Sequence, residues 1–193
     1  AKSELVRELA PLADLFVLDG FSVAHRSHAS VVGFAAVLPA VAGRVMEKEL
    51  RSLEKALEKP EKPCIYILGG AKAEKCVDII RYVLEKGIAD KVLTGGLVGH
   101  LFLKAKGIQL GKPSDEVLEK KGLAGLADAM KEILEAFPGK IEVPVDVACD
   151  VEGKREEKSV EELPVEYPIM DIGSRTAEAY SSMVKEAKSV VVS

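Results

Sequence analysis

From Pro63 onward, this chain alternates short apolar runs with longer amphipathic segments, and this alternation constrains its fold more than any other feature. The apolar runs predict strands and the amphipathic segments predict helices. The predicted strands span 65–68, 91–94, 141–145, 168–173 and 189–192, and the predicted helices span 73–86, 97–105, 114–137 and 174–187. Strands that alternate with helices form a parallel sheet covered by helices. We therefore predict an α/β fold whose main lobe is a parallel-sheet, Rossmann-like three-layer sandwich.

The first 62 residues have a different pattern. The sequence predicts the end of a helix up to residue 13, a short buried strand over 14–18, a polar loop over 25–30 and a small-residue connection over 33–41. A long helix over 45–59 follows, with many charges on one side, and Pro60 and Pro63 end it. A helix of this kind between two apolar regions is typical of a connection between two domains.

Two of the predicted strands end at a pair of glycines that precedes a helix. Gly69 and Gly70 follow the first strand, with Ala71 and Lys72 directly behind them, and a second pair at 95–96 follows the next strand. Glycine lets the backbone approach a ligand closely, and a helix N-terminus attracts a phosphate. Ligands in such folds lie at the carboxyl ends of the strands, and we expect both glycine pairs and Gly173 to lie at that edge of the parallel sheet. The first pair with its lysine therefore predicts a phosphate or nucleotide site, although a plain turn is the commoner origin of a glycine pair.

Composition excludes several other classes of function. A net charge of -4 and a pI near 5.6 argue against nucleic acid or a membrane surface as the main partner. No apolar run approaches the length of a membrane span, so we expect a cytoplasmic protein. The three cysteines lack metal or redox spacing and are predicted to be buried free thiols. The chain has no asparagine and a single glutamine, Gln109, together with many lysines and glutamates, which is typical of thermophile proteins.

Several segments, in order, resemble the phosphoglycerate kinase family. Residues 19–30 (Asp-Gly-Phe-Ser-Val-Ala-His-Arg-Ser-His-Ala-Ser) resemble the end of that family's N-terminal lobe, and residues 43–50 resemble the start of its interdomain helix. Leu68 to Lys72 match its Gly-Gly-Ala-Lys signature, residues 94–107 resemble its glycine loop and helix, and residues 144–146 and 171–173 resemble two later motifs. The resemblance covers nearly the whole chain but only the middle of a family member about twice as long.

The resemblance implies phosphoryl transfer between 1,3-bisphosphoglycerate and ADP, which gives 3-phosphoglycerate and ATP, with Mg²⁺ carried by the nucleotide. It divides the chain into the end of a phosphoglycerate-binding lobe (1–42), an interdomain helix (43–62) and a nucleotide-binding lobe that is incomplete at its C-terminus (63–193). It assigns catalytic roles to Lys72 and Arg26, and it places phosphoglycerate near Asp19, His25, Arg26 and His28. The nucleotide-binding positions that it implies are Gly69, Gly70, Ala71, Lys72, Lys75, Gly95, Gly96 and Gly173.

The chain departs from the family pattern in the spacing of its lysines. The family has Gly-Gly-Ala-Lys-x-x-Asp-Lys, whereas Lys72 and Lys75 are three residues apart here and Cys76 occupies the position of the second family lysine. Two family segments are also absent from the chain: the N-terminal segment that supplies most arginines of the substrate patch, and a late Gly-Gly-Asp-Ser/Thr loop. These departures keep a second hypothesis open, a non-catalytic nucleotide-binding protein of the same fold. A dinucleotide oxidoreductase is a third possibility, but the chain lacks the G-x-G-x-x-G fingerprint at 68–72. The sequence does not determine the oligomeric state.

Overall fold

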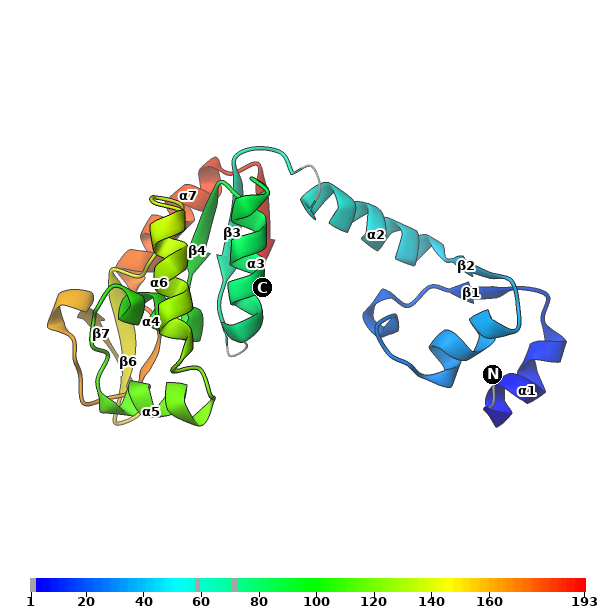
Figure 1. Ribbon diagram of the computed structural model, residues 1–193, viewed down its shortest axis with the longest axis horizontal. Coiled ribbons are helices and arrows are strands. Elements are labelled where there is room, and N and C mark those ends of the chain that lie inside the picture. The colour runs from blue at the N-terminus through cyan, green and yellow to red at the C-terminus, as the bar shows by residue number, and fades with distance from the viewer. Residues whose placement is uncertain (1–2, 58–59, 71–72) are drawn as a thin grey trace. The chain divides into compact units, whose positions relative to one another are not determined.

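A computed structural model describes residues 3–57, 60–70 and 73–193 of the chain. It divides the chain into two compact units, unit 1 at residues 1–59 and unit 2 at residues 60–193 (Figure 1). Ala71 and Lys72, which carry part of the predicted nucleotide site, lie outside the described residues. Among the described residues, no helix has both the length and the apolar character that crossing a membrane requires.

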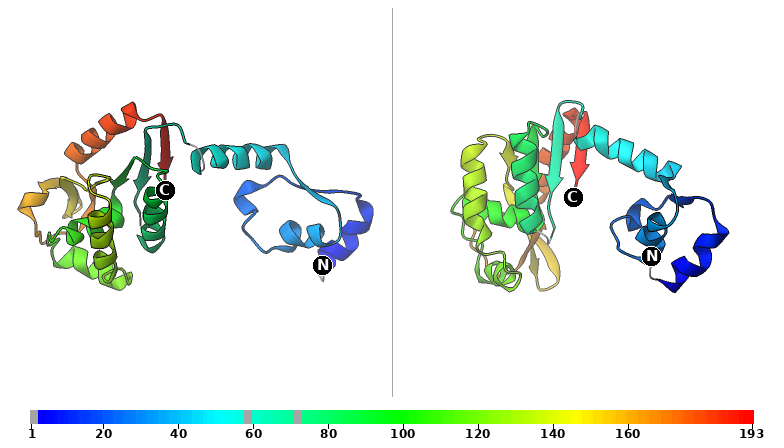
Figure 2. Two further views of the ribbon diagram at one scale, coloured as in Figure 1. Left: turned by 45° about the horizontal axis from the view of Figure 1, so that its top comes forward. Right: turned by 45° about the vertical axis from the view of Figure 1, so that its right-hand side comes forward.

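Unit 1 is built on two short strands and two helices. Its elements are α1 (Glu4–Leu9), β1 (Phe16–Leu18), β2 (Ala40–Ala42) and α2 (Arg44–Leu57), with short helical turns at Ala10–Leu12, Phe21–Val23, Ala29–Gly33 and Phe34–Ala36. The two strands pair in parallel, with Phe16 opposite Ala40 (Figure 2). The sequence predicted β1 but read the region of β2 as a connection, because a three-residue strand of small apolar residues has no distinctive pattern.

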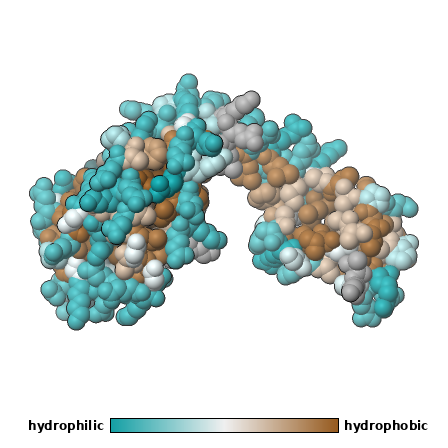
Figure 3. Space-filling view, in the orientation of Figure 1, coloured by the Kyte–Doolittle hydropathy of each residue, from teal (hydrophilic) through white to brown (hydrophobic). Residues whose placement is uncertain are grey.

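Unit 1 carries much of its apolar surface exposed to solvent. Its buried hydrophobic side chains, among the residues described, are those of Val6, Val31 and Met46. Large apolar side chains stay exposed along the unit, and brown hydrophobic residues gather on the face that Figure 3 shows. Leu12, for example, is 79 % exposed. The apolar residues of unit 1 are thus mostly unburied within this chain.

Unit 2 contains the predicted parallel sheet. Four strands, β3 (Cys64–Leu68), β4 (Lys91–Thr94), β5 (Ile141–Glu142) and β9 (Ser189–Val192), lie in the order β5-β4-β3-β9, and every pair is parallel. Five helices accompany them: α3 (Ala73–Glu85), α4 (Gly96–Ala105), α5 (Lys112–Lys120), α6 (Leu126–Ala136) and α7 (Ser174–Glu186). The predicted strand–helix alternation is confirmed in this unit.

Helices cover both faces of this sheet, because side chains alternate along a strand and apolar ones lie on both faces. Tyr66 and Leu68 of β3 belong to the main core, which α3, α4 and α6 close from one side. Ile65 of the same strand and Leu93 of β4 point to the opposite face and pack with Tyr180 of α7. Figure 1 shows α7 on the other side of the sheet from α3. The prediction of a three-layer α/β sandwich is confirmed.

A second sheet, which the sequence did not predict, flanks the first. It consists of β6 (Asp146–Val151), β7 (Lys154–Ser159) and β8 (Ile169–Ile172) in the antiparallel order β7-β6-β8, and a helical turn, Val160–Glu162, follows β7. The sequence predicted a hairpin or loop over 150–162, and the hairpin is present, but it assigned 168–173 to the parallel sheet, which is wrong. Antiparallel sheets tolerate one solvated face, so the five charged residues of β7 fit an exposed strand.

The long helix predicted over 114–137 is in fact two helices. Helix α5 ends at Lys120, and α6 starts at Leu126 after a turn in which Gly122 has a φ of 69°. A residue with this left-handed backbone ends a helix, and glycine adopts it without strain. The three cysteines are buried and free, as predicted, and burial raises the pKa of each thiol.

Candidate functional site

The two glycine pairs of the sequence meet at the carboxyl edge of the parallel sheet. Strands β3 and β4 pair so that Leu68 lies opposite Thr94, which places Gly69 and Gly95 next to each other. The Gly95 N–H donates to the Leu68 carbonyl oxygen at 3.1 Å. The expected proximity of these glycines at one sheet edge is thereby confirmed.

The two turns approach each other too closely for larger residues. A Cβ added to Gly69 would lie 3.3 Å from the carbonyl oxygen of Gly95, and one added to Gly96 would lie 2.8 Å from the Gly70 nitrogen. Gly70 and Gly96 also have φ values of 77° and 51°, which side chains disfavour. At these described glycines the two turns therefore meet through backbone atoms, and a backbone surface of this kind can receive a flat ligand.

The turn after β3 leads into the N-terminus of α3, a location that attracts phosphate. Lys75, on the first turn of this helix, is exposed to solvent. Cys76 is buried, and its thiol lies 4.0 Å from the Gly69 carbonyl oxygen. The residue at the family's second lysine position therefore packs under the glycine turn and offers no cation, whereas Lys75 presents one to solvent on the first turn of the helix.

The turn after β4 is closed by a carboxylate that sequence reasoning missed. The Gly96 N–H, at the start of α4, donates to Asp171 Oδ1 at 2.8 Å, and the Ile172 N–H donates to the same oxygen at 2.8 Å. Asp171 lies on β8, 75 residues further along the chain. A negative charge at a helix N-terminus satisfies its free N–H groups and disfavours a second anion there. The Gly96 N–H at the start of α4 is therefore already satisfied by a side chain of the chain itself.

Gly173 does not lie at the edge of the parallel sheet, contrary to the sequence-based prediction. It follows β8 of the antiparallel sheet, and a Cβ on it would lie 2.2 Å from a carboxylate oxygen of Asp146. The buried Asp146 carboxylate accepts the Arg175 N–H at 3.0 Å and the Thr176 N–H at 2.8 Å, and so caps α7. Gly173 is required here because a side chain would displace that carboxylate.

A buried histidine lies one helical turn beyond Gly96. His100 is 3 % exposed, and neither of its ring nitrogens has a hydrogen-bond partner among the described residues. Burial lowers the pKa of His100 to about 4, although the nearby charge of Asp171 acts in the opposite direction. The ring is therefore neutral at physiological pH. Nothing in the sequence pattern singled out this residue, because a lone histidine in an apolar helix is usually part of the core.

In unit 1, the residues predicted to hold phosphoglycerate lie in and beside one loop. The side chains of His25, Arg26 and His28 are exposed to solvent, as an anion-binding loop requires. The Asp19 carboxylate accepts the Met46 N–H at 2.9 Å, near the start of α2.

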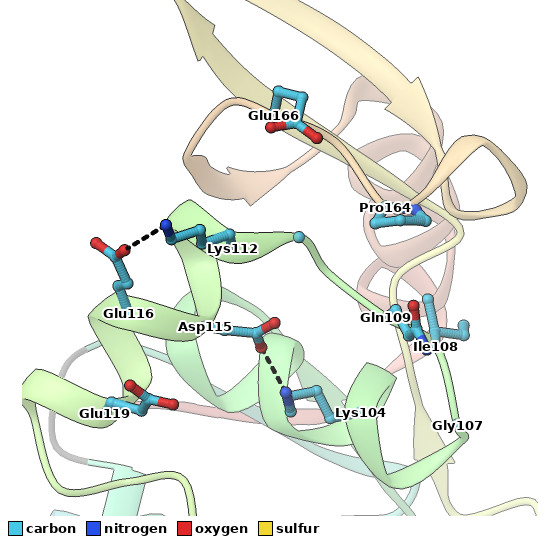
Figure 4. A pocket seen from close by; sticks show the side chains of 11 residues that line it. Lys104, Gly107, Ile108, Gln109, Lys112, Asp115, Glu116, Glu119, Pro164 and Glu166 are labelled. Atoms are coloured by element: carbon cyan, nitrogen blue, oxygen red, sulfur yellow. Dashed lines mark hydrogen bonds and ion pairs between the residues drawn. The ribbon is translucent and has the colours of Figure 1, made fainter.

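A hollow of about 750 Å³ opens elsewhere in unit 2, between the end of α4, α5 and the segment before β8 (Figure 4). Its charged side chains are largely paired with one another: Lys104 contacts Asp115, and Lys112 lies 4.0 Å from Glu116. Glu119 and Glu166 add further negative charge to its lining. Acidic side chains outnumber basic ones here, so this hollow is a poor site for a nucleotide despite its size.

Over its whole length the chain is similar to known phosphoglycerate kinases. The family model described as phosphoglycerate kinase matches residues 1–193. Phosphoglycerate kinases from Methanothermobacter thermautotrophicus and Methanopyrus kandleri are 45 % and 47 % identical to the chain and cover 98 % and 99 % of it. The crystal structure of phosphoglycerate kinase from Pyrococcus horikoshii OT3 matches 99 % of the chain with a TM-score of 0.90 and 42 % identity. The chain spans about half the length of these relatives, 46 %, 47 % and 48 % respectively.

Proposed function

Because this chain belongs to the phosphoglycerate kinase family, we propose that the protein carrying it transfers a phosphoryl group reversibly from 1,3-bisphosphoglycerate to ADP. The products are 3-phosphoglycerate and ATP, which makes the protein a phosphotransferase of glycolysis and gluconeogenesis. The relatives include proteins from archaeal thermophiles. This fits the absence of asparagine and the many lysines and glutamates in the chain. The domain division at 1–42, 43–62 and 63–193 is part of the same proposal.

One observation supports the nucleotide site more than any other: two glycine turns lie side by side at the carboxyl edge of the sheet, each before a helix, and a carboxylate, that of Asp171, accepts the Gly96 N–H of the second turn. Phosphates suit the start of α3, where the dipole end is positive and the sequence places Lys72 and Lys75 on either side of a single acidic residue, Glu74. The uncharged nucleobase suits the bare surface of Gly95 and Gly96. The nucleotide then lies across the carboxyl edge of the sheet, with its phosphates toward α3.

Lys72 would stabilise the phosphoryl group in the transition state of its transfer. That group carries its charge on three equatorial oxygens, and a positioned ammonium stabilises it more than it stabilises the ground state. Arg26, with His25 and His28 beside it, would bind the carboxylate or phosphate of the phosphoglycerate, because a guanidinium donates two parallel hydrogen bonds to such groups.

Mg²⁺ would enter this site bound to the nucleotide phosphates. No cluster of three or more histidine, cysteine or acidic side chains suited to a metal occurs in the part of the chain that the structure describes. Magnesium in kinases is held largely by phosphate oxygens and water with one or two carboxylates, so the residues present are compatible with an ion that arrives with its substrate. The ion would neutralise phosphate charge during transfer.

Calorimetric titration of MgADP into the wild type, Lys72→Ala and Lys86→Ala tests the site. Lys86 follows the other end of α3, and so its replacement removes the same charge away from the glycine turns. We expect binding to the wild type and K86A, and binding weakened about tenfold or more in K72A, since a charge-assisted contact contributes about 1.5–3 kcal/mol. Equal affinities in K72A and K86A would refute this assignment of Lys72.

A further inference from the structure

The turn between β4 and α4 is held from two sides. On one side the Gly95 N–H donates to the Leu68 carbonyl oxygen of β3 at 3.1 Å. On the other side the Gly96 N–H donates to Asp171 Oδ1 at 2.8 Å. The same oxygen would lie only 3.3 Å from a Cβ on Gly95, so the carboxylate packs directly against both glycines.

A Gly-Gly turn needs such contacts because glycine has unusual conformational freedom. Gly96 has a φ of 51°, and it is also the first residue of α4, where backbone N–H groups lack partners within the helix. Without the carboxylate, the turn could rotate its N–H toward solvent at little steric cost. The Asp171 contact therefore selects one backbone conformation for the surface of the turn.

Asp171 is itself held firmly by the antiparallel sheet. The Gly173 N–H donates to the Asp146 carbonyl oxygen at 3.0 Å, and the Ile169 N–H donates to the buried Ser114 hydroxyl at 3.1 Å. Strand β8 is thus fixed to other elements on both sides of Asp171. The carboxylate is a rigid link between the antiparallel sheet and the glycine turn, and the charge of Asp171 also reaches His100 on α4.

We propose that Asp171 is a positioning residue for the nucleotide: its carboxylate accepts the Gly96 N–H and so holds the Gly95–Gly96 turn in the conformation that receives the nucleobase. This inference rests on the nucleotide site proposed above and adds a residue to which that proposal gives no role. Asp171 acts through the backbone of Gly96 and does not contact the phosphates. Its loss should weaken recognition of the base and leave recognition of the phosphates unchanged.

The test compares three variants in the intact protein that carries this chain. Asp171→Ala removes both the charge and the acceptor, whereas Asp171→Asn keeps an acceptor oxygen for the Gly96 N–H. Asp150→Ala is the matched control, because Asp150 lies in the same antiparallel sheet and its carboxylate accepts a backbone N–H, that of Gly153, at 2.8 Å. Each variant is titrated with MgADP and with magnesium pyrophosphate, a probe that lacks the base and the ribose.

We expect D171A to bind MgADP about tenfold more weakly, as loss of one charged hydrogen bond predicts, while its pyrophosphate affinity stays at the wild-type level. D171N should recover most of the MgADP affinity, and D150A should match the wild type with both probes. If D171A does not fold, Asp171→Glu replaces it, since glutamate keeps the charge but moves the acceptor by one methylene group. It should likewise weaken MgADP and spare pyrophosphate.

Three outcomes would overturn the inference. Pyrophosphate affinity that falls in parallel with MgADP affinity would mean that the whole site is damaged, and MgADP affinity in D171A equal to that in D150A would mean that the link to Gly96 has no role in binding. Both outcomes leave the nucleotide site intact as a proposal. No MgADP binding by a folded wild type would overturn the inference and the proposed site together.

Discussion

Replacing the buried His100 with leucine should remove a pH-dependent loss of stability that the wild type shows below neutral pH. Burial lowers the pKa of this histidine from its ordinary value of 6.5 to about 4. Between these two values the unfolded chain binds a proton that the folded chain does not. The free energy of unfolding must therefore fall as the pH is lowered through this window.

The size of the effect follows from the shift. At pH 5 the unfolded histidine is almost fully protonated and the folded one is almost fully neutral. With about 1.36 kcal/mol for each pKa unit, the wild type should lose about 2 kcal/mol between pH 7 and pH 5 through His100 alone. Leucine has a similar volume and no titrating group, so the H100L variant should lack this contribution and keep the losses that come from other groups.

Urea unfolding at pH 7 and pH 5, followed by far-ultraviolet circular dichroism, measures the difference directly. The chain contains no tryptophan, which makes the backbone signal the better probe. Tyr66→Phe is the control: its hydroxyl is likewise buried and unpartnered in the described structure, and burial raises its pKa away from this window. Y66F should follow the wild type. If the wild type and H100L lose the same stability between the two pH values, the reasoning about His100 is wrong.

Three further predictions concern packing in unit 2. Gly173→Ala places a Cβ 2.2 Å from a carboxylate oxygen of Asp146 and should lower the free energy of unfolding by about 3 kcal/mol, within the range for overpacking. Gly122→Ala should lower it by only about 1 kcal/mol, because Gly122 has a positive φ. Similar losses in both variants, measured by urea unfolding, would contradict this. Tyr180→Phe removes a hydroxyl that lies 3.0 Å from two backbone carbonyl oxygens and should cost about 1 kcal/mol, and an unchanged midpoint would count against that contact. The three buried thiols should react with a disulfide reagent only as the protein unfolds, because burial raises their pKa and blocks access; fast labelling of the folded chain would show that they are accessible.

The fold was predictable where one pattern dominates. The apolar runs of β3 and β4 are buried on both faces, and only a central parallel strand combines that with a helix on either side. The antiparallel sheet was missed because β7 is almost entirely charged, which is typical of loops as well as of exposed strands. The order of strands in space does not follow from their order in the sequence, and so residues 168–173 were assigned to the wrong sheet.

The candidate site was predictable only in part, as the fold was. The glycine pairs were found because the carboxyl ends of parallel strands share one edge, a rule that needs only the strand assignments. Asp171 was missed because its contact with Gly96 joins residues 75 positions apart, one on strand β8 and the other at the start of helix α4. Gly173 was placed at the wrong edge for the same reason, since its neighbour, Asp146, belongs to an antiparallel strand that the sequence did not reveal.

We propose above that the protein carrying this chain is a phosphoglycerate kinase that uses Lys72 in phosphoryl transfer. The most direct measurement is the rate of ATP formation from 1,3-bisphosphoglycerate and MgADP by the intact protein, compared with its Lys72→Ala and Lys86→Ala variants. We expect turnover by the wild type and by K86A and a severe loss of turnover in K72A. A folded wild-type protein that binds MgADP but forms no ATP would contradict this proposal and would support the non-catalytic nucleotide-binding protein instead.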